Sequence, residues 1–164
     1  MVFDRGYLDD PAGLEFLPGA AQGLRTLHSR GYRLVVITNQ SGVGRGLFPE
    51  ERVHAMNARL RRMVEEAGAQ LEQIYFCPHA PAAGCDCRKP GLKLMAQAAA
   101  ELGFEPARAA VIGDKLSDIE FGQRVGALTI LIAPAGPQAG TSTASDYVAE
   151  NLEQAAQIIL DRRD

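Results

Sequence analysis

Residues 33–42 read Arg-Leu-Val-Val-Ile-Thr-Asn-Gln-Ser-Gly, and the fold can be worked out from this stretch. After the arginine comes a short apolar run with several β-branched side chains, which is typical of a strand buried on both faces. The run becomes polar at Thr38, where such a strand should end. The preceding residues 19–29 carry Leu24 and Leu27 at helical spacing. The stretch therefore predicts a helix that leads into a buried strand.

The same alternation continues along the rest of the chain. Further strands are expected over 71–76, 109–112 and 128–132, and further helices over 49–68, 91–102, 116–125 and 152–160. Pro49 suits the first turn of its helix, and Asn151 is a suitable N-cap for the last one. Strands that are apolar throughout and separated by helices indicate a parallel sheet covered on both faces. We therefore expect an α/β fold of the three-layer Rossmann-like type, with residues 133–145 as a loop.

The composition fits one globular domain over 1–164, without a separate cap domain. The chain has 164 residues, and 46% of them are hydrophobic, which is enough for a single core. A formal net charge of -3 and a pI near 5.6 argue against a general nucleic-acid surface, which needs a basic footprint. No apolar run approaches the roughly 18 residues that cross a bilayer, and the start shows no cleavable signal pattern. We expect a cytoplasmic monomer with no membrane partner.

All three cysteines fall in a short segment that also holds a histidine. The run is Cys77-Pro-His79, followed by Cys85-Asp-Cys87. Three thiolates and one imidazole form the ligand set of a closed, tetrahedral structural Zn²⁺ site. Scattered buried cysteines or a disulfide are the alternatives, although a Cys-x-Cys disulfide would be strained. We expect Zn²⁺ in a zinc loop over 77–87, and reduced, metal-bound cysteines agree with a cytoplasmic location.

Three polar clusters follow three of the expected strands, at residues 38–42, 77–89 and 113–118. In open parallel sheets the ligand lies beyond the carboxyl ends of the strands. The three clusters should therefore face one crevice, although they are far apart in the sequence.

The first two clusters offer hydrogen-bond donors and positive charge for a phosphate. The Thr38 hydroxyl and the backbone amides of the following Ser-Gly turn can donate to phosphate oxygens, and Arg45 can reach the same pocket. Lys89 offers a compact positive charge for a transferring phosphoryl group, while Arg88 can hold a second anion through two parallel hydrogen bonds. An ordinary turn at a strand end and solvated surface cations are the alternatives.

The third cluster offers carboxylates for a metal ion. Asp114 comes directly after an apolar strand and a glycine, which suits a hard oxygen ligand for Mg²⁺. Asp118 lies one helical turn later and can support the same site. An Asp that caps a helix is the alternative. The common edge of all three clusters favours one site for Mg²⁺ and a phosphate.

With these residues assembled, the chain resembles the haloacid dehalogenase-like phosphatases, in particular their branch of heptose bisphosphate and histidinol phosphatases. The matching segments are Gly6-Tyr7, Thr38-Asn39-Gln40-Ser41-Gly42, Arg45-Gly46, Cys77-Pro78-His79, Cys85-Asp86-Cys87-Arg88-Lys89-Pro90 and Gly113-Asp114-Lys115-Leu116-Ser117-Asp118. The resemblance implies that Thr38 and Lys89 orient the phosphoryl group, with Arg88 beside it. It implies that Asp114 holds Mg²⁺. The residues that it places near the substrate are Asp4, Gly6, Tyr7, Asn39, Gln40, Ser41, Arg45 and Lys115.

The resemblance also implies a reaction and a substrate. In this family the reaction passes through an aspartyl-phosphate, while the metal neutralises the charge of the phosphate. The Cys-Asp-Cys-Arg-Lys run and the compact length favour D-glycero-D-manno-heptose 1,7-bisphosphate, a lipopolysaccharide precursor, cleaved at its 7-phosphate. Arg88 and Arg45 are then the candidates for the second phosphate. Histidinol phosphate is the alternative substrate.

The chain departs from the family at its start. The family begins with a central strand that ends in Asp-x-Asp-Gly, which supplies the nucleophile and the general acid/base, and no such motif occurs in these 164 residues. Asp4 is followed by Arg-Gly, and the three residues before it are too few for a central strand. We therefore expect that the sequence begins after its catalytic motif, lacks the first central strand and is inactive as written. The alternative is a non-catalytic descendant that keeps the pocket as a binding or interaction module.

Overall fold

The computed structural model describes residues 11–134 and 145–162. Asp4, Gly6 and Tyr7, three of the predicted substrate-contacting residues, lie outside these ranges, as does most of the predicted loop 133–145. Among the described residues no helix combines the length and the apolar character that a bilayer requires.

The first half of the described chain builds a two-stranded parallel sheet. Its strands pair in the register Leu34 with Leu71 and Thr38 with Phe76. The elements are the 3₁₀ turn Pro11–Gly13, α1 (Ala20–Ser29), β1 (Leu34–Asn39), α2 (Ser41–Gly44), α3 (Glu50–Glu66) and β2 (Leu71–Cys77). The apolar run at the centre of the prediction is therefore a strand, and it extends one residue beyond Thr38.

The second half builds a three-stranded parallel sheet in the order β3-β4-β5. The elements are the 3₁₀ turns Pro81–Ala83 and Pro106–Arg108, α4 (Lys93–Leu102), β3 (Ala110–Gly113), α5 (Leu116–Gln123), β4 (Leu128–Ile132), β5 (Tyr147–Ala149) and α6 (Leu152–Asp161). Asn151 caps α6 as predicted, because its side-chain oxygen accepts a hydrogen bond of 3.0 Å from the backbone N–H of Gln154.

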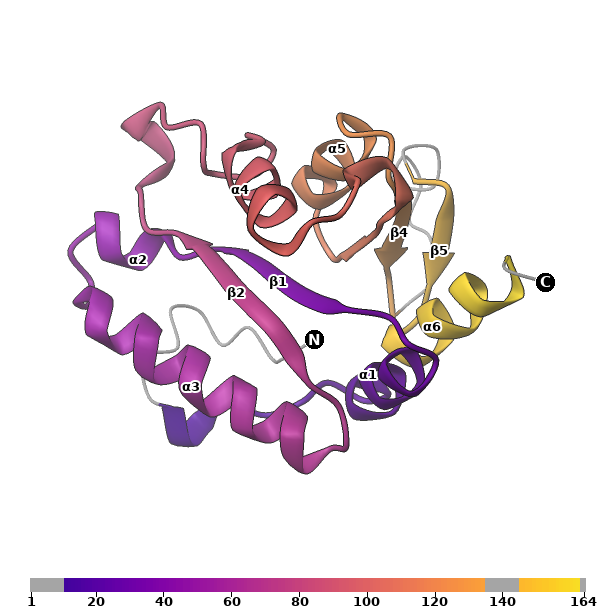
Figure 1. The fold of residues 1–164 in the computed structure, drawn as a ribbon. Coiled ribbons are helices and arrows are strands. Elements are labelled where there is room, and N and C mark those ends of the chain that lie inside the picture. Colours follow the sequence, from indigo (N-terminus) through magenta and orange to yellow (C-terminus); the bar gives the residue numbers. More distant parts are fainter. Residues whose placement is uncertain (1–10, 135–144, 163–164) are drawn as a thin grey trace.

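The described elements form three layers, with one layer of strands between two layers of helices, in agreement with the predicted α/β class. Figure 1 shows α4 and α5 on one face of the strands and α1, α3 and α6 on the other. Helices α1 and α6 lie so close that a Cβ on Gly23 would come within 2.5 Å of the backbone oxygen of Leu152. The largest buried cluster lies between these helices and the strands and includes Leu71 and Ile130.

The strands of the described chain do not form one continuous sheet. Strand β1 pairs with β2 and β3 pairs with β4, but no pairing between β1 and β3 is present among the described residues. Only Leu34 of β1 is buried and all four residues of β3 are half-exposed, whereas β4 has three buried residues at its centre. Among the described residues, the strands are therefore divided into two sheets between β1 and β3 (Figure 1).

Several predicted boundaries were wrong by one or two residues; the strand expected over 109–112, for example, is Ala110–Gly113, and the helix expected over 49–68 ends at Glu66. The helix expected from Gly91 begins at Lys93, because the backbone N–H groups of Gly91 and Lys93 bond to the oxygens of Arg88 and Asp86 and close a turn first. Pro49 is the N-cap of α3 and not a residue of its first turn. The helix expected over 116–125 ends at Gln123. The short elements α2 and β5 were not predicted.

Candidate functional site

One cavity of about 2190 Å³ opens between the two sheets, and residues of both β1 and β3 line it. Its polar part contains every described residue that the sequence assigned to phosphate, substrate or Mg²⁺. These residues are Thr38, Asn39, Gln40, Ser41, Arg45, Arg88, Lys89, Asp114, Lys115 and Asp118. Pockets for small molecules measure roughly 300–1,000 Å³, so a small ligand alone would leave much of this cavity unfilled.

In the part of the chain that the structure describes, no strand pairs with the backbone edges that face this cavity. Successive residues of a strand direct their N–H and C=O groups to opposite edges. Since the N–H of Gln40 bonds to Cys77 of β2, the groups of Ile37 and Asn39 face away from β2. On the other side the oxygen of Ala109 accepts from Leu128 of β4, so the groups of Ile112 face away from β4. Both edges border the cavity.

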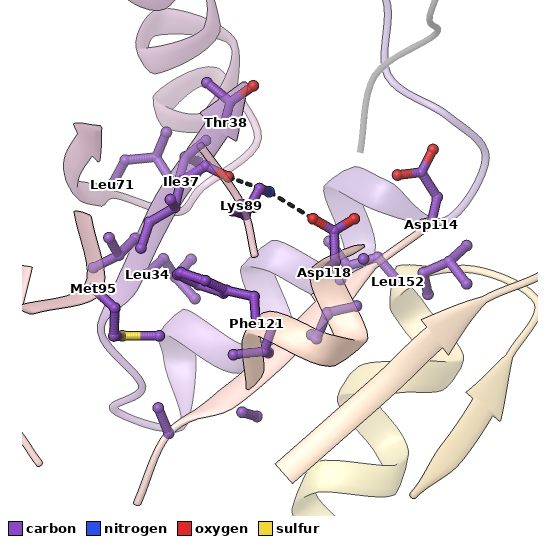
Figure 2. Close-up of a pocket in the computed structure, with 18 of the residues that line it drawn as sticks. Leu34, Ile37, Thr38, Leu71, Lys89, Met95, Asp114, Asp118, Phe121 and Leu152 are labelled. Atoms are coloured by element: carbon purple, nitrogen blue, oxygen red, sulfur yellow. Dashed lines mark hydrogen bonds and ion pairs between the residues drawn. The ribbon is translucent and has the colours of Figure 1, made fainter. Parts of the chain in front are cut away.

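Lys89 connects the two sides of the cavity. Its Nζ donates a 2.6 Å hydrogen bond to the backbone oxygen of Ile37 in β1 and lies 2.7 Å from Oδ1 of Asp118 in α5. Figure 2 shows the ammonium between these two groups. The side chains of Lys89 and Asp118 are 16% and 8% exposed, so the ion pair is largely shielded from water. Lys89 therefore stands at the entrance to the gap, held by one contact from each half of the sheet.

The other oxygen of Asp118 accepts a hydrogen bond of 3.2 Å from the backbone N–H of Lys115. Gly113 makes this arrangement possible, because a Cβ at this position would overlap the carboxylate of Asp118. Asp118 was expected to support a Mg²⁺ ion. In this structure its two oxygens hold Lys89 and the first turn of α5.

Asn39 holds the backbone of Lys89. Its Oδ1 accepts a hydrogen bond of 3.0 Å from the N–H of Lys89, and its Nδ2 donates one of 3.3 Å to the oxygen of Lys89. The neighbouring Gln40 donates from Nε2 to Oγ1 of Thr38 over 3.3 Å. The sequence grouped Asn39 and Gln40 with the substrate contacts, whereas here both amides contact the residues predicted to orient the phosphoryl group.

Arg88 lines the same cavity with an unpartnered nitrogen. Its Nη1 is buried and has no hydrogen-bond partner among the described residues. A buried charged donor without an acceptor costs roughly 1–3 kcal/mol or more. An anionic ligand in the cavity would remove that cost, so the arrangement fits the predicted contact with a phosphate.

Asp114 follows β3 and is exposed at the mouth of the cavity. Figure 2 shows its carboxylate at the end of β3, beyond Asp118 as seen from Lys89. Mg²⁺ is usually held by one or two carboxylates together with waters and phosphate oxygens. The exposed carboxylate of Asp114 therefore fits the donor type that Mg²⁺ requires.

The four predicted zinc ligands meet at the end of β2. One ligand atom from each of Cys77, His79, Cys85 and Cys87 lies within 4.8 Å of all the others. The Cys87 Sγ is 3.0 Å from the Cys77 Sγ and 3.1 Å from the Nδ1 of His79, and the Cys85 Sγ is 3.5 Å from each of the other sulfurs. Ligands around one tetrahedral Zn²⁺ lie roughly 3.5–3.8 Å apart. The cluster is thus compact enough to surround a single ion.

The thiols of this cluster have divergent acidities. Burial raises the pKa of Cys87 to about 12, and the adjacent thiols of Cys77 and Cys85 add to this effect. Burial also acts against the thiolate of Cys85, but hydrogen bonds from the backbone of Arg88 and from the other two thiols outweigh it and lower its pKa to about 7. The protein groups alone therefore do not stabilise three thiolates together, and a bound dication would supply the missing positive charge.

The zinc loop is attached to the end of β1 as well as to β2. The N–H of Gly44 in α2 donates to the oxygen of Pro78 over 2.8 Å, and a Cβ on Gly44 would overlap the backbone of Ala80. Arg88 and Lys89 follow Cys87 directly in the sequence. The cluster thus fixes the start of the segment that carries the two cations of the cavity.

Sequence reasoning did not identify the partners of Lys89, which include the oxygen of Ile37 and the amide of Asn39. The carbonyl of Ile37 is a backbone group in a predicted strand, so nothing in the sequence marks it as free to bind a side chain. The amide of Asn39 was noticed as a polar residue after that strand, but its partner 50 positions away was not.

Comparison with known proteins shows the family to which the chain belongs. Residues 86–155 match the family model described as HAD-hydrolase-like. The chain is 34% identical over 140 residues to a D-glycero-beta-D-manno-heptose-1,7-bisphosphate 7-phosphatase of Haemophilus ducreyi, covering 81% of this chain and 77% of that protein. The protein of the same name from Haemophilus influenzae is 32% identical over 166 residues, with 95% and 89% covered. The chain belongs to the haloacid dehalogenase-like phosphatase family.

Solved structures of this family superpose on the whole described fold. The D,D-heptose 1.7-bisphosphate phosphatase from B. bronchiseptica, complexed with magnesium and phosphate, matches with a TM-score of 0.83 and 28% identity, covering 94% of this chain and 88% of that one. The D,D-heptose 1,7-bisphosphate phosphatase from Burkholderia thailandensis matches with a TM-score of 0.68 and 29% identity, with 93% and 90% covered. The predicted haloacid dehalogenase-like fold is confirmed.

Proposed function

We propose that this chain forms the phosphate-binding and metal-binding part of a Mg²⁺-dependent phosphatase for D-glycero-D-manno-heptose 1,7-bisphosphate, cleaved at the 7-phosphate. The observation that carries the proposal is the meeting of Thr38, Arg88, Lys89 and Asp114 in one cavity at the carboxyl ends of the strands. These residues come from three separate segments, and together they supply a hydroxyl donor, two cations and a metal-binding carboxylate. That set matches the needs of a phosphoryl group in a displacement reaction.

Each residue has a role that follows from its position. Thr38 donates its hydroxyl to a phosphate oxygen, and the ammonium of Lys89 stabilises the negative charge of the transferring group. Arg88 offers its unpartnered Nη1 to an anion. Mg²⁺ at Asp114 would neutralise further charge on the phosphate. The related enzyme from B. bronchiseptica was crystallised with magnesium and phosphate, which supports this choice of metal.

The nucleophile is proposed to come from an Asp-x-Asp strand seated between β1 and β3. Two observations support this position: among the described residues no strand pairs with the edges of β1 and β3 that face the cavity, and the cavity is larger than a small ligand requires. A strand of about six residues, roughly 20 Å long, would match the length of β1. Its carboxyl end would lie beside Lys89 and Asp114, where a carboxylate can reach a phosphate bound there.

The choice of substrate depends on the cations available for a second phosphate and on the names of the related proteins. Arg88 and Arg45 line the same cavity as Lys89, so the site carries more positive charge than one phosphoryl group requires. The relatives with 30–38% identity in Haemophilus, Yersinia and Pseudomonas are named as heptose-1,7-bisphosphate 7-phosphatases. A bisphosphate is therefore favoured over histidinol phosphate, which offers one phosphate only.

The cysteine cluster is proposed to hold structural Zn²⁺. Four ligands leave no open coordination position, so the metal would stabilise the loop and take no part in the reaction. Since Zn²⁺ binding requires reduced thiolates, the proposal also places the protein in the cytoplasm.

The test uses a version of the protein extended upstream through an Asp-x-Asp strand. Phosphate release should depend on Mg²⁺, and kcat/KM should be higher for the heptose bisphosphate than for histidinol phosphate. In that version Lys89→Met and Thr38→Val should each lower kcat by roughly 10²–10³-fold, the usual effect of removing one donor to the developing charge. A higher kcat/KM on histidinol phosphate would reverse the substrate assignment. A folded, Mg²⁺-loaded protein without activity on either compound would favour the binding-module alternative.

A further inference from the structure

Lys89 lies on a segment that spans the gap between the two sheets by direct hydrogen bonds. The segment 88–91 contacts β1 through Asn39 and Ile37, and it contacts α5 through Asp118 and through Arg124, whose Nη1 donates to the oxygen of Pro90 over 3.3 Å. Any shift of this segment moves the ammonium that the proposed reaction uses. The contacts of its backbone therefore control where the ammonium lies.

We propose that Asn39 is a positioning residue for Lys89 and makes no contact with the substrate. This inference rests on the proposed role of Lys89 in holding the phosphoryl group. Both polar atoms of the Asn39 amide are used: Oδ1 accepts from the N–H of Lys89 and Nδ2 donates to its oxygen. A side-chain amide carries an acceptor and a donor, so it can bond to the N–H and to the oxygen of one residue at once.

The position of Asn39 explains why it can make both bonds. It is the last residue of β1, and its backbone faces the gap and not β2. The side chain therefore extends past the end of the strand toward the segment that follows Cys87. Aspartate would keep the acceptor but turn its second oxygen toward the oxygen of Lys89, so the contact would be half lost.

The hydrogen bonds from Asn39 to segment 88–91 are better shielded from water than the hydrogen bond from Arg124. The two bonds between Asn39 and Lys89 are partly buried, whereas Arg124 is an exposed side chain that also pairs with Glu120. Solvent competes with exposed contacts, so Arg124 should contribute little to the position of the segment. Arg124→Ala is therefore a matched control that removes a contact to the same segment.

The first measurement is amide hydrogen exchange at Lys89 in residues 1–164. Asn39→Ala should accelerate it at least fivefold, since two hydrogen bonds to the Lys89 backbone are lost. Asn39→Asp should give a smaller acceleration, and Arg124→Ala should change the rate less than twofold. If Asn39→Ala does not fold, Asn39→Leu, which has nearly the same shape and removes both bonds, is measured against the same fivefold threshold. A folded Asn39→Ala protein with less than fivefold acceleration would overturn the proposal.

The second measurement separates positioning from direct contact. Binding of inorganic phosphate with Mg²⁺ is measured for Asn39→Ala, Lys89→Met and the double variant. If Asn39 acts through Lys89, the double variant should bind as weakly as Lys89→Met alone, within twofold. Additive losses would mean that Asn39 contacts the phosphate itself and would overturn the proposal. If Lys89→Met leaves phosphate binding unchanged, the role proposed for Lys89 in the reaction fails, while hydrogen exchange still decides whether Asn39 positions it.

Discussion

The ammonium of Lys89 lies 2.7 Å from a carboxylate oxygen of Asp118, and both side chains are largely buried. A second ion pair on the same helix, between Arg124 and Glu120 at 3.0 Å, is about half exposed at both ends. The two pairs therefore differ chiefly in their access to water. Removal of one partner from a buried pair leaves an uncompensated charge, whereas exposed pairs contribute little.

This contrast leads to a stability prediction. Asp118→Ala should lower the free energy of unfolding by roughly 3 kcal/mol, because Lys89 then keeps a buried charge without a counter-ion. Glu120→Ala on the same helix should lower it by about 0.5 kcal/mol or less. Urea unfolding of the two variants beside the parent chain measures both values. Equal losses in the two variants would show that burial does not set the strength of the Lys89–Asp118 pair.

The zinc loop can be tested without any activity assay. Purified protein should contain about one equivalent of Zn²⁺, since its four candidate ligands form one closed set. Cys85→Ser should lose most of the metal and should accelerate amide exchange in Arg88 and Lys89, which follow the loop directly. His54→Ala is the control, because this exposed histidine pairs with Glu50 and lies outside the cluster. Correctly folded parent protein without zinc would contradict the assignment.

The fold could be predicted where local pattern and tertiary environment agree. The strand expected over 128–132 has those bounds, because a continuous apolar run suits a strand with buried neighbours on both sides. The strand Tyr147–Ala149 was missed, since three residues carry too little pattern and its pairing with β4 is a long-range contact. The helix α2 was missed because Ser-Gly-Val-Gly has low helix propensity and is held by the zinc loop.

The members of the site were predictable, but most of their contacts were not. Thr38 and Asp114 lie at the ends of predicted strands and Lys89 follows a predicted metal loop, and the edge rule for parallel sheets is enough to bring them together. The contacts of Lys89 with Ile37 and Asn39 depend on which edge of β1 is free, and that is a property of the assembled sheet. For the same reason the sequence did not reveal that Asp118 pairs with Lys89.

Acid stability should depend on Asp146. Hydrogen bonds from the backbone N–H and the hydroxyl of Thr129, each 2.8 Å long, lower the pKa of this carboxyl. A carboxylate whose pKa is lower in the folded state adds stability above its unfolded pKa of about 3.9. That stability is lost as the pH falls through the folded pKa. Because Asp146 is exposed, its contribution should be about 1 kcal/mol or less.

Asp146→Asn removes this carboxyl. The variant should therefore lose less stability than the parent chain as the pH falls from about 5 to about 2, an interval set by the reference pKa of about 3.9. Thr129→Ser keeps both donors to Asp146, so its pH dependence should match that of the parent chain. Urea midpoints at several pH values measure the slopes. An unchanged slope in Asp146→Asn would assign the acid sensitivity to other carboxyl groups.

The gap between β1 and β3 leads to the last prediction, which concerns residues 1–164 as written. This chain contains no Asp-x-Asp motif, and Asp114 and Asp118 alone provide only part of a Mg²⁺ shell. Loss of a nucleophile commonly lowers kcat by several orders of magnitude, because the groups of a catalytic unit act together. We therefore expect no Mg²⁺-dependent phosphate release above background from residues 1–164.

A version extended upstream through an Asp-x-Asp strand should be active and should also melt at a higher temperature. The added strand would pair with the edges of β1 and β3 that face the gap and would bury apolar surface that now lines the cavity. A matched extension with Asn in place of the first Asp of the motif should gain the same thermal stability without activity, which separates the structural from the chemical effect. Equal activity with and without the extension would mean that Asp4, or another group in residues 1–164, is the nucleophile. An active extension without any gain in melting temperature would show that the strand lies elsewhere than between β1 and β3.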